Sequence, residues 1–180
     1  SCLDQVSIIA MGQGKVTLRP ATPADRRQVF DWLLRAYQNP VFCPGEPPPS
    51  WEQFTQDYLP FFFDQSRPDQ GGLFIILVQG QDAGVVSYDA RYSGPSEVDV
   101  DIWMRSEDHC NQGWGTAALN MLCGHLHDQL AFNGFVICPS ASNQRALRAY
   151  EKCGFSICPD DQGQRGLLDC DDALIMKRTI

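Results

Sequence analysis

The hydrophobic pattern of the first third of the chain predicts a strand followed by two helices. VTLRP (16–20) alternates between apolar and polar residues and ends at a proline, as strands do. TPAD (22–25) then has the form of a helix start with an acidic first turn, and the apolar residues behind it recur at helical spacing. SWEQ (50–53) is a capping box, which predicts a second helix rich in aromatic residues.

The remaining two thirds continue with strands and helices in turn. The predicted elements are a hairpin made of LFIILVQ, the turn GQDAG and GVVSYDARYS, a strand EVDVDIWM (97–104), a helix at 116–131, a strand FVICP, a helix at 143–154 that ends at a glycine, and two closing strands in FSICP and LDCDDALIMKR. This order indicates a mixed α/β (α+β) fold.

The chain has the size of one domain. Its 180 residues are enough for one buried core and too few for two comfortable ones. We expect residues 1–14 to be an N-terminal arm and residues 15–180 to be the domain. QNPVFCPGEPPPS (38–50) contains five prolines, so it predicts a long irregular loop. Such a loop is typical either of a binding site or of a rigid connector, and the pattern leaves both open.

Composition excludes several classes of protein. The formal charge of −8 argues against a nucleic-acid partner and suits a cationic substrate. No apolar run approaches the length of a bilayer span, so no membrane partner is expected. The eight cysteines form no C-x-x-C pair and the three histidines no ligand cluster, so we expect no metal. Without an export signal, we expect most of the cysteines to be small buried residues in a reducing cytoplasm. The oligomeric state is left open.

Two glycines precede a predicted helix in CNQGWGTAAL (110–119). Glycine lets the backbone approach a ligand without a Cβ in the way, and the N–H groups at a helix start favour an anion. The stretch lacks the third glycine of a dinucleotide fingerprint and the lysine of a phosphate-binding P-loop. A glycine loop of this kind indicates either an anion site or an ordinary turn.

EVDVDIWM places three carboxylates on one face of a strand. Strand periodicity puts Glu97, Asp99 and Asp101 on one side and the apolar residues between them on the other. Neighbouring carboxylates repel one another, so we expect a raised pKa for at least one of them. Such a group can act as a general base or hold an amine, whereas an acidic alternation can also be a solvated sheet face.

PSASNQRALRAYEKCGF (139–155) predicts a helix capped by Asn143 with Tyr150 on its inner side. The tyrosine has two interpretations. It is either a core aromatic residue with a bonded hydroxyl or a proton donor to a leaving group at the edge of the helix.

The two motifs together resemble the GNAT superfamily of acetyl-CoA-dependent N-acetyltransferases. NQGWGTAAL after one strand and NQRALRAYEKCGF after the next occur in the order of that superfamily, over about residues 16–178. The resemblance implies a single GNAT-like domain with a mixed, mostly antiparallel twisted sheet of about seven strands, flanked by about four helices. DIWM and PSASNQRA are similar to the aminoglycoside 6′-N-acetyltransferase branch. The anion of the glycine loop would then be the pyrophosphate of acetyl-CoA.

The resemblance also implies roles for individual residues. Asp101 matches an aspartate near the acceptor amine and Tyr150 a tyrosine that protonates the departing thiolate, so both are expected to be catalytic. Glu97 and Asp99 are expected to hold the cationic substrate. The expected cofactor-binding residues are Ile102, Trp103 and Met104 along the pantetheine arm, Asn111, Gln112, Gly113, Trp114, Gly115 and Thr116 around the pyrophosphate, and Asn143.

The sequence departs from the family pattern at two positions. Cys110 stands where the phosphate loop usually has Arg or Gln, and Cys138 replaces an aspartate that the aminoglycoside enzymes offer to the substrate. No cysteine stands where an acyl-enzyme nucleophile is indicated, so we expect direct acetyl transfer, in a ternary complex, to the primary amine of a small, cationic acceptor, aminoglycoside-like or another amine. The alternatives are a protein N-terminus or a lysine-like siderophore precursor as acceptor, and a non-catalytic acyl-CoA-binding module.

Overall fold

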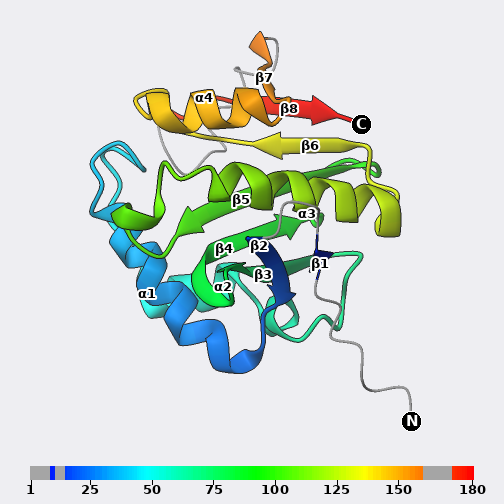
Figure 1. Cartoon of the computed structure of the whole chain (residues 1–180), viewed down its shortest axis with the longest axis horizontal. Coiled ribbons are helices and arrows are strands. Elements are labelled where there is room, and N and C mark those ends of the chain that lie inside the picture. Colours follow the sequence, from blue (N-terminus) through cyan, green and yellow to red (C-terminus); the bar gives the residue numbers. More distant parts are fainter. Residues whose placement is uncertain (1–8, 11–14, 160–171) are drawn as a thin grey trace.

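The computed structural model of the chain describes residues 9–10, 15–159 and 172–180. Figure 1 shows the arrangement of its elements around one central sheet. In chain order they are β1 (Ile9–Ala10), β2 (Val16–Pro20), the 3-10 turn η1 (Pro23–Asp25), α1 (Arg26–Tyr37), α2 (Trp51–Asp57), η2 (Pro60–Phe63), β3 (Gly71–Val78), β4 (Gln81–Asp89), β5 (Glu97–Met104), η3 (Glu107–His109), α3 (Trp114–Leu130), β6 (Gly134–Ile137), α4 (Gln144–Lys152), β7 (Ser156–Ile157) and β8 (Met176–Thr179).

The sheet has the strand order β1-β2-β3-β4-β5-β6-β8-β7. Every neighbouring pair is antiparallel except β5 and β6, which are parallel. The count of eight includes the two-residue strands β1 and β7 at the edges. The expected mixed, mostly antiparallel sheet with four flanking helices is therefore confirmed.

The parallel pair β5–β6 separates part of the way along its length. Residues 97–99 of β5 pair with residues 134–136 of β6, and the pairing ends there although β5 continues to Met104. The Arg105 N–H donates a hydrogen bond to the Ala83 carbonyl. In an antiparallel pair only every second residue bonds the neighbouring strand, so the residues of β5 that bond β4 are those at odd-numbered positions. The backbone groups of Ile102 and Met104 face the other way, toward the opening. The end of β5 thus presents a free edge at the centre of the sheet.

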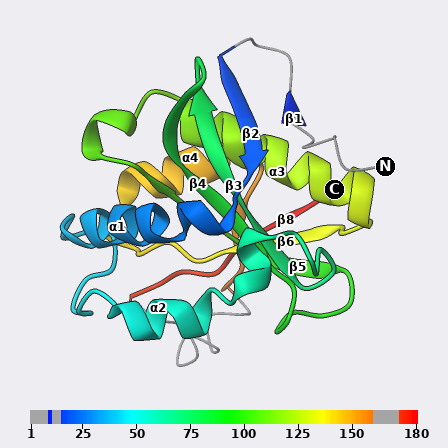
Figure 2. The same ribbon diagram turned by 90° about the horizontal axis from the view of Figure 1, so that it is seen from below.

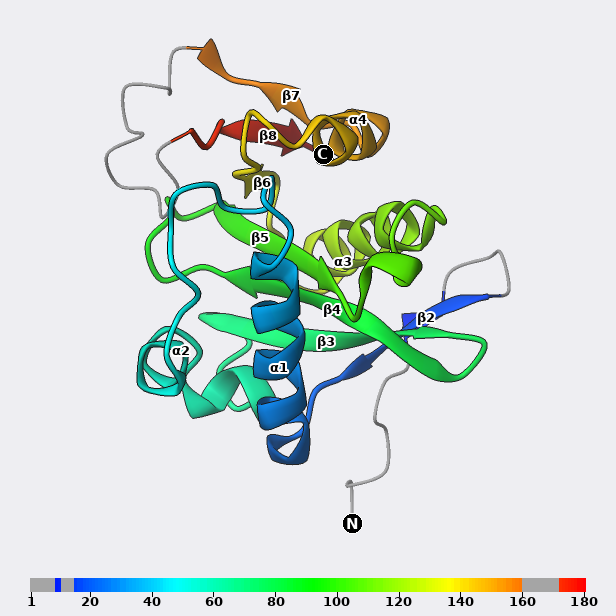
Figure 3. The same cartoon turned by 90° about the vertical axis from the view of Figure 1, so that its left-hand side faces the viewer.

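Each face of the sheet has its own core. One face packs against α3, with Leu119, Leu122 and Leu126 among the fully buried residues. The opposite face carries Trp103 and is covered by α1, α2 and η2, whose aromatic residues pack on it. Figures 2 and 3 show α3 and α4 on one side of the strands and α2 on the other. Side chains from both faces of the sheet can therefore contact a ligand that enters the opening between β5 and β6.

Several predicted boundaries agree with the structure and others shift. The strands at 16–20 and 97–104 are confirmed, and Ser50 and Gln53 form the predicted reciprocal capping box with hydrogen bonds of 2.8 and 3.1 Å. The hairpin turn is shorter than predicted, because Gln79 and Gly80 both adopt positive φ and close it in two residues. Of the predicted arm at 1–14, only β1 lies within the described residues. The predicted closing strand at 168–178 is described only from residue 172.

Candidate functional site

A cavity of about 770 Å³ lies at the open end of β5. Its wall is built from the end of α1 and the loop behind it, from the last residues of β5, from the segment 106–116 and from α4. Asn39 and Phe42 of the proline-rich loop line it, so the part of that loop near residue 40 belongs to the site.

No helix within the described residues is long and apolar enough to cross a membrane.

The glycine loop forms one wall of the cavity. Asn111 and Gly113 have positive φ values of 59° and 79°, which turn the chain sharply into α3. The helix begins at Trp114, two residues earlier than predicted. Its first intrahelical bond runs from the Ala117 N–H to the Gly113 carbonyl, so the N–H groups before it have no partner inside the helix. These groups and the dipole of a 17-residue helix favour an anion.

Gly113→Val is expected to weaken binding of coenzyme A at least about tenfold, since binding at this loop relies on close backbone approach. Its φ of 79° is strained for any β-branched residue, although an added Cβ there would meet no atom within 4 Å. Calorimetric titration with coenzyme A measures the change. Gly94→Val, at another glycine where an added Cβ would meet nothing within 4 Å, is a control outside this cavity. Equal affinity of the Gly113 variant and the wild type would contradict an anion site at this loop.

Helix α4 follows Asn143 and carries Tyr150. Asn143 caps the helix, since its Oδ1 accepts a hydrogen bond of 3.1 Å from the Ala146 N–H. The Tyr150 ring packs edge-on against Phe155 at 6.4 Å between centroids, and its hydroxyl has no hydrogen bond to a described residue that would fix it in the core. Burial raises the pKa of the hydroxyl, and the charge of Asp101 raises it further. The group is therefore a neutral donor at physiological pH.

Asp101 lies on the free edge of β5. Its Oδ1 accepts a hydrogen bond of 2.8 Å from the Ile102 N–H, one of the backbone groups that face the opening rather than β4. Its side chain is exposed on the face covered by α1 and α2, whereas Tyr150 packs against the opposite core. The charge of Asp101 raises the pKa of the Tyr150 hydroxyl, so the two groups lie within electrostatic range of each other.

The acidic face of β5 is confirmed as a single face. Asp99 and Asp101 are exposed between buried apolar residues, and Asp89 of β4 stands opposite Asp99. Partial desolvation, followed by the charges of Asp89 and Glu97, raises the pKa of Asp99 to about 6. The expected raised carboxylate is thus Asp99. Glu97 forms an ion pair of 3.4 Å with Lys177, which reduces the charge it offers to a ligand.

Asp99→Asn is expected to stabilise the protein at pH 8 and to leave its stability at pH 4 nearly unchanged. The pKa of Asp99 is higher in the folded protein than in the unfolded chain, so its favourable contribution is complete below about pH 4 and is lost as pH rises through about 6. Because Asp99 is exposed, we expect a gain of only about 1 kcal/mol. Thermal unfolding across this pH range measures it. A difference between variant and wild type that does not change with pH would contradict the raised pKa.

Most of the predicted cofactor-binding residues come together. The predicted residues that line the cavity are Ile102, Trp103, Met104, Asn111, Gly113, Gly115, Thr116, Asn143 and Tyr150. Trp103 also belongs to the α1 side, where its Nε1 donates a 3.3 Å hydrogen bond to the Val29 carbonyl. Gln112 and Trp114 do not line the cavity, and neither do Glu97, Asp99 and Asp101, which extend from its edge along β5.

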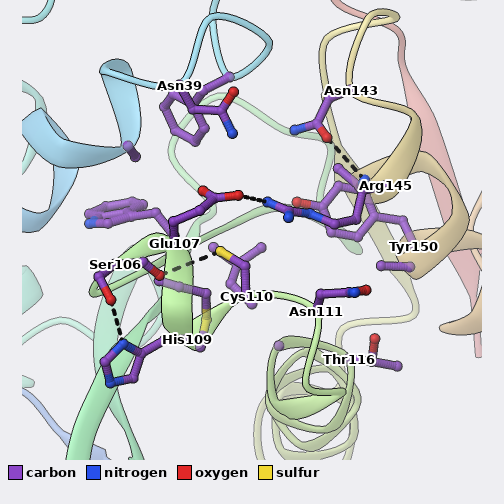
Figure 4. Close-up of a pocket in the computed structure, with 18 of the residues that line it drawn as sticks. Asn39, Ser106, Glu107, His109, Cys110, Asn111, Thr116, Asn143, Arg145 and Tyr150 are labelled. Carbon is purple, nitrogen blue, oxygen red and sulfur yellow. Dashed lines mark hydrogen bonds and ion pairs between the residues drawn. The ribbon is translucent and has the colours of Figure 1, made fainter.

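Sequence reasoning missed the charged residues of the cavity. Glu107 of η3 and Arg145 of α4 form an ion pair of 2.9 Å across it (Figure 4). Arg148 and Lys152 of α4 also line the wall. The sequence NQRALRAYEK does contain a sign of these residues, because the basic positions 145, 148 and 152 share one side of a helix. Helical periodicity alone does not show whether that side faces a cavity or solvent.

The cysteines differ from the expectation that most are buried apolar residues. Cys123 and Cys153 are buried as expected, whereas Cys110 is half-buried in the cavity wall and Cys138 is exposed. Cys43 is disulfide-bonded, which corrects the prediction for that residue. Spacing gave no sign of this bond, because a disulfide joins positions that are set by the fold and not by a local motif.

The site fits coenzyme A on its own geometry. Bare backbone N–H groups at a helix start suit a pyrophosphate. The end of β5 that is not paired with β6 is an exposed strand edge of the kind that can pair with the amides of a pantetheine arm, although its Ile102 N–H already donates to Asp101. The closeness of Gly115 to β5 shows how tightly the loop approaches this edge, since a Cβ built there would lie 3.2 Å from Ile102 Cδ1.

Comparison with known proteins agrees with this geometry. A family profile described as "Acetyltransferase (GNAT) domain" matches residues 15–156. Two curated relatives, from Klebsiella pneumoniae and Serratia marcescens, are aminoglycoside N(6′)-acetyltransferases of type 1. Each is 27% identical over 163 residues, which cover 85% of this chain and 80% of the relative.

Solved structures share the fold. AAC(6′)-Ib in complex with ribostamycin and coenzyme A is 21% identical, with a TM-score of 0.68 over 92% of this chain and 93% of the other. RimL, a ribosomal L7/L12 alpha-N-protein acetyltransferase, is 20% identical, with a TM-score of 0.73 over 98% of this chain and 96% of the other. The two neighbours act on different kinds of amine, so the shared fold does not select the acceptor.

Proposed function

The chain belongs to the acetyltransferase (GNAT) family and is an acyltransferase that uses acetyl-CoA, and we propose that its acceptor is the primary amine of a small, cationic molecule. One observation carries this proposal. Asp101 lies on the edge of β5 beside the cavity and Tyr150 lies in the cavity wall, so a carboxylate and a neutral phenol are within electrostatic range of each other at one site. A base on the acceptor side and a proton donor on the cofactor side are the two groups that acetyl transfer to an amine requires.

The acidic face of β5 supports a cationic acceptor. Asp99 and Asp101 extend from the opening along one side of β5, with side chains about 7 Å apart by strand geometry. Asp89 adds a third carboxylate beside Asp99, although Arg91 neutralises it through hydrogen bonds of 2.8 and 3.0 Å. A molecule with more than one ammonium group fits this row better than a neutral amine. The aminoglycoside-like acceptor is one member of that class.

Asp101 and Tyr150 have separate roles in the proposed reaction. An ammonium ion has no lone pair, so Asp101 takes a proton from the acceptor, directly or through a water molecule. When bound, acetyl-CoA supplies a thioester whose sulfur leaves as a thiolate. Tyr150 donates its proton to the place where that charge develops, and the raised pKa keeps this proton on the hydroxyl until then.

The state of Cys110 supports direct transfer without an acetylated enzyme. Cys110 is a free cysteine in the cavity wall, and burial followed by the charge of Glu107 raises the pKa of its thiol. The thiol, unlike the thiolate, is a weak nucleophile. We therefore propose that the amine and the cofactor are bound at the same time, in a ternary complex.

A screen of acetyl-CoA consumption across amine classes tests the acceptor. Aminoglycosides, polyamines, lysine derivatives and short peptides are offered under the same conditions, and the products are identified by mass spectrometry. Turnover that is fastest with small polycationic amines supports the proposal. Turnover confined to peptide N-termini would assign the protein N-terminus as the acceptor instead. Tight binding of acetyl-CoA without turnover of any amine would identify a non-catalytic binding module.

A further inference from the structure

Three cationic side chains follow one side of α4 in the cavity wall. Arg145, Arg148 and Lys152 all line the cavity, and their spacing of three and four residues puts them on a single helix face. The chain as a whole has a formal charge of −8, so this local concentration of positive charge opposes the overall balance. It lines the same cavity as residues of the glycine loop.

The three cations differ in their partners. Arg145 pairs with Glu107 at 2.9 Å, as Figure 4 shows, whereas Arg148 and Lys152 form no ion pair within the described part of the chain. Both side chains are exposed, and the neighbouring carboxylate of α4, Glu151, pairs with neither of them in that part of the chain. Neither residue is therefore engaged by a carboxylate of the described chain, and both line the cavity.

Coenzyme A carries two separate groups of negative charge. Its diphosphate is matched by the N–H groups at the start of α3, where Cys110 leaves the loop without a cation of its own. Its 3′-phosphate is a monoester, which carries a charge of about −1.5 to −2 at pH 7. This group is joined to the diphosphate through one ribose, so it must lie near the loop and the adjacent helix.

We propose that Arg148 and Lys152 bind the 3′-phosphate of coenzyme A and make the site selective for coenzyme A over its dephosphorylated form. Their Cα atoms lie about 6 Å apart along the helix axis, which lets two long side chains converge on one phosphate. A guanidinium and an ammonium on one dianion form charge-assisted hydrogen bonds. The proposal rests on acetyl-CoA as the donor and is independent of which amine accepts the acetyl group.

An ordinary solvated helix face is the competing interpretation. Lys152 lies in the last turn of α4, where a cation is favoured by the helix dipole without any ligand. That interpretation predicts that removal of either charge changes helix stability and leaves the preference between ligands unaffected. The two interpretations are therefore distinguished by comparing the affinities for coenzyme A and for its dephosphorylated form. The affinity for coenzyme A alone does not distinguish them.

The test is calorimetric titration of coenzyme A and dephospho-coenzyme A into the wild type and into Arg148→Gln/Lys152→Gln. We expect the wild type to prefer coenzyme A by about tenfold, as two partly exposed charge-assisted contacts would give. The double variant should lose this preference while its affinity for dephospho-coenzyme A stays within about twofold of the wild type, because that ligand lacks the phosphate the two cations bind. The preference of the wild type should shrink as salt is raised.

Two controls keep the result interpretable. Arg67→Gln removes an exposed cation outside the cavity and should leave the preference intact, which excludes an effect of net charge. The single variants Arg148→Gln and Lys152→Gln, each checked by thermal unfolding, replace the double variant if it folds poorly. Equal weakening of both ligands, or an unchanged preference in a folded variant, would overturn the proposal.

Discussion

Tyr150→Phe is expected to lower kcat by at least about 10²-fold and to leave the affinity for coenzyme A nearly unchanged. The hydroxyl is the only group removed, and the ring keeps its edge-on contact with Phe155. A proton donor acts on the charge that develops as the thiolate departs, so its loss affects the transition state and not the ground state. Steady-state kinetics together with calorimetry separate the two quantities.

Tyr88→Phe is the matched control for this prediction. It also removes one tyrosine hydroxyl, but that hydroxyl donates a 2.7 Å hydrogen bond to the Pro68 carbonyl, away from the cavity. We expect this variant to lose stability by about 1 kcal/mol and to keep its rate. If Tyr150→Phe behaves like the control, with lower stability and full kcat, Tyr150 is a core aromatic residue and not the proton donor.

Asp101→Asn is expected to lower kcat by about 10²-fold or more and to remove the acidic limb of the pH–rate profile. Asparagine keeps the shape of the side chain, and its amide oxygen can still accept the hydrogen bond from the Ile102 N–H. The variant therefore removes the proposed base while the geometry of the β5 edge is preserved. The pH dependence of kcat and kcat/KM in the variant and the wild type is the measurement.

Asp99→Asn serves as the comparison on the same strand face. Asp99 lies two residues away on the same face of β5, and Asp101 is the carboxylate whose charge raises the pKa of Tyr150. Its replacement should mainly raise KM for a cationic amine, since it supplies attraction in the ground state and no proton transfer. A full rate for Asp101→Asn together with a lost rate for Asp99→Asn would move the role of base to Asp99, whose pKa of about 6 suits it.

Local sequence patterns predicted the parts of the site that local geometry determines. The alternation in EVDVDIWM correctly placed Asp99 and Asp101 on one face, because the period of a strand leaves no other arrangement. The cap by Asn143 was equally local. The start of α3 was predicted two residues late, since a glycine at position 115 disfavours a helix by propensity, whereas the structure places it inside the first turn, close to Ile102.

The parts that depend on tertiary structure were not predictable from periodicity. The helical period of α4 is equally compatible with a solvated face, and Arg148 and Lys152 line a cavity because the ends of α1 and β5 and the segment 106–116 complete its wall. The ion pair between Glu107 and Arg145 joins residues 38 positions apart, and no local pattern relates them. The separation of β5 from β6 is likewise a feature of sheet pairing, which ends at Asp99, and the alternation within EVDVDIWM does not indicate it.

One measurement tests direct transfer to an amine most directly. The protein is incubated with acetyl-CoA, with and without a polycationic amine, while free thiol and acetylated acceptor are both quantified. We predict thiol release that depends on the amine, one acetylated product for each thiol released, and no acetylated protein. Release of thiol at the same rate without an amine, or an acetylated form of the protein that precedes the product, would contradict direct transfer at the opening between β5 and β6.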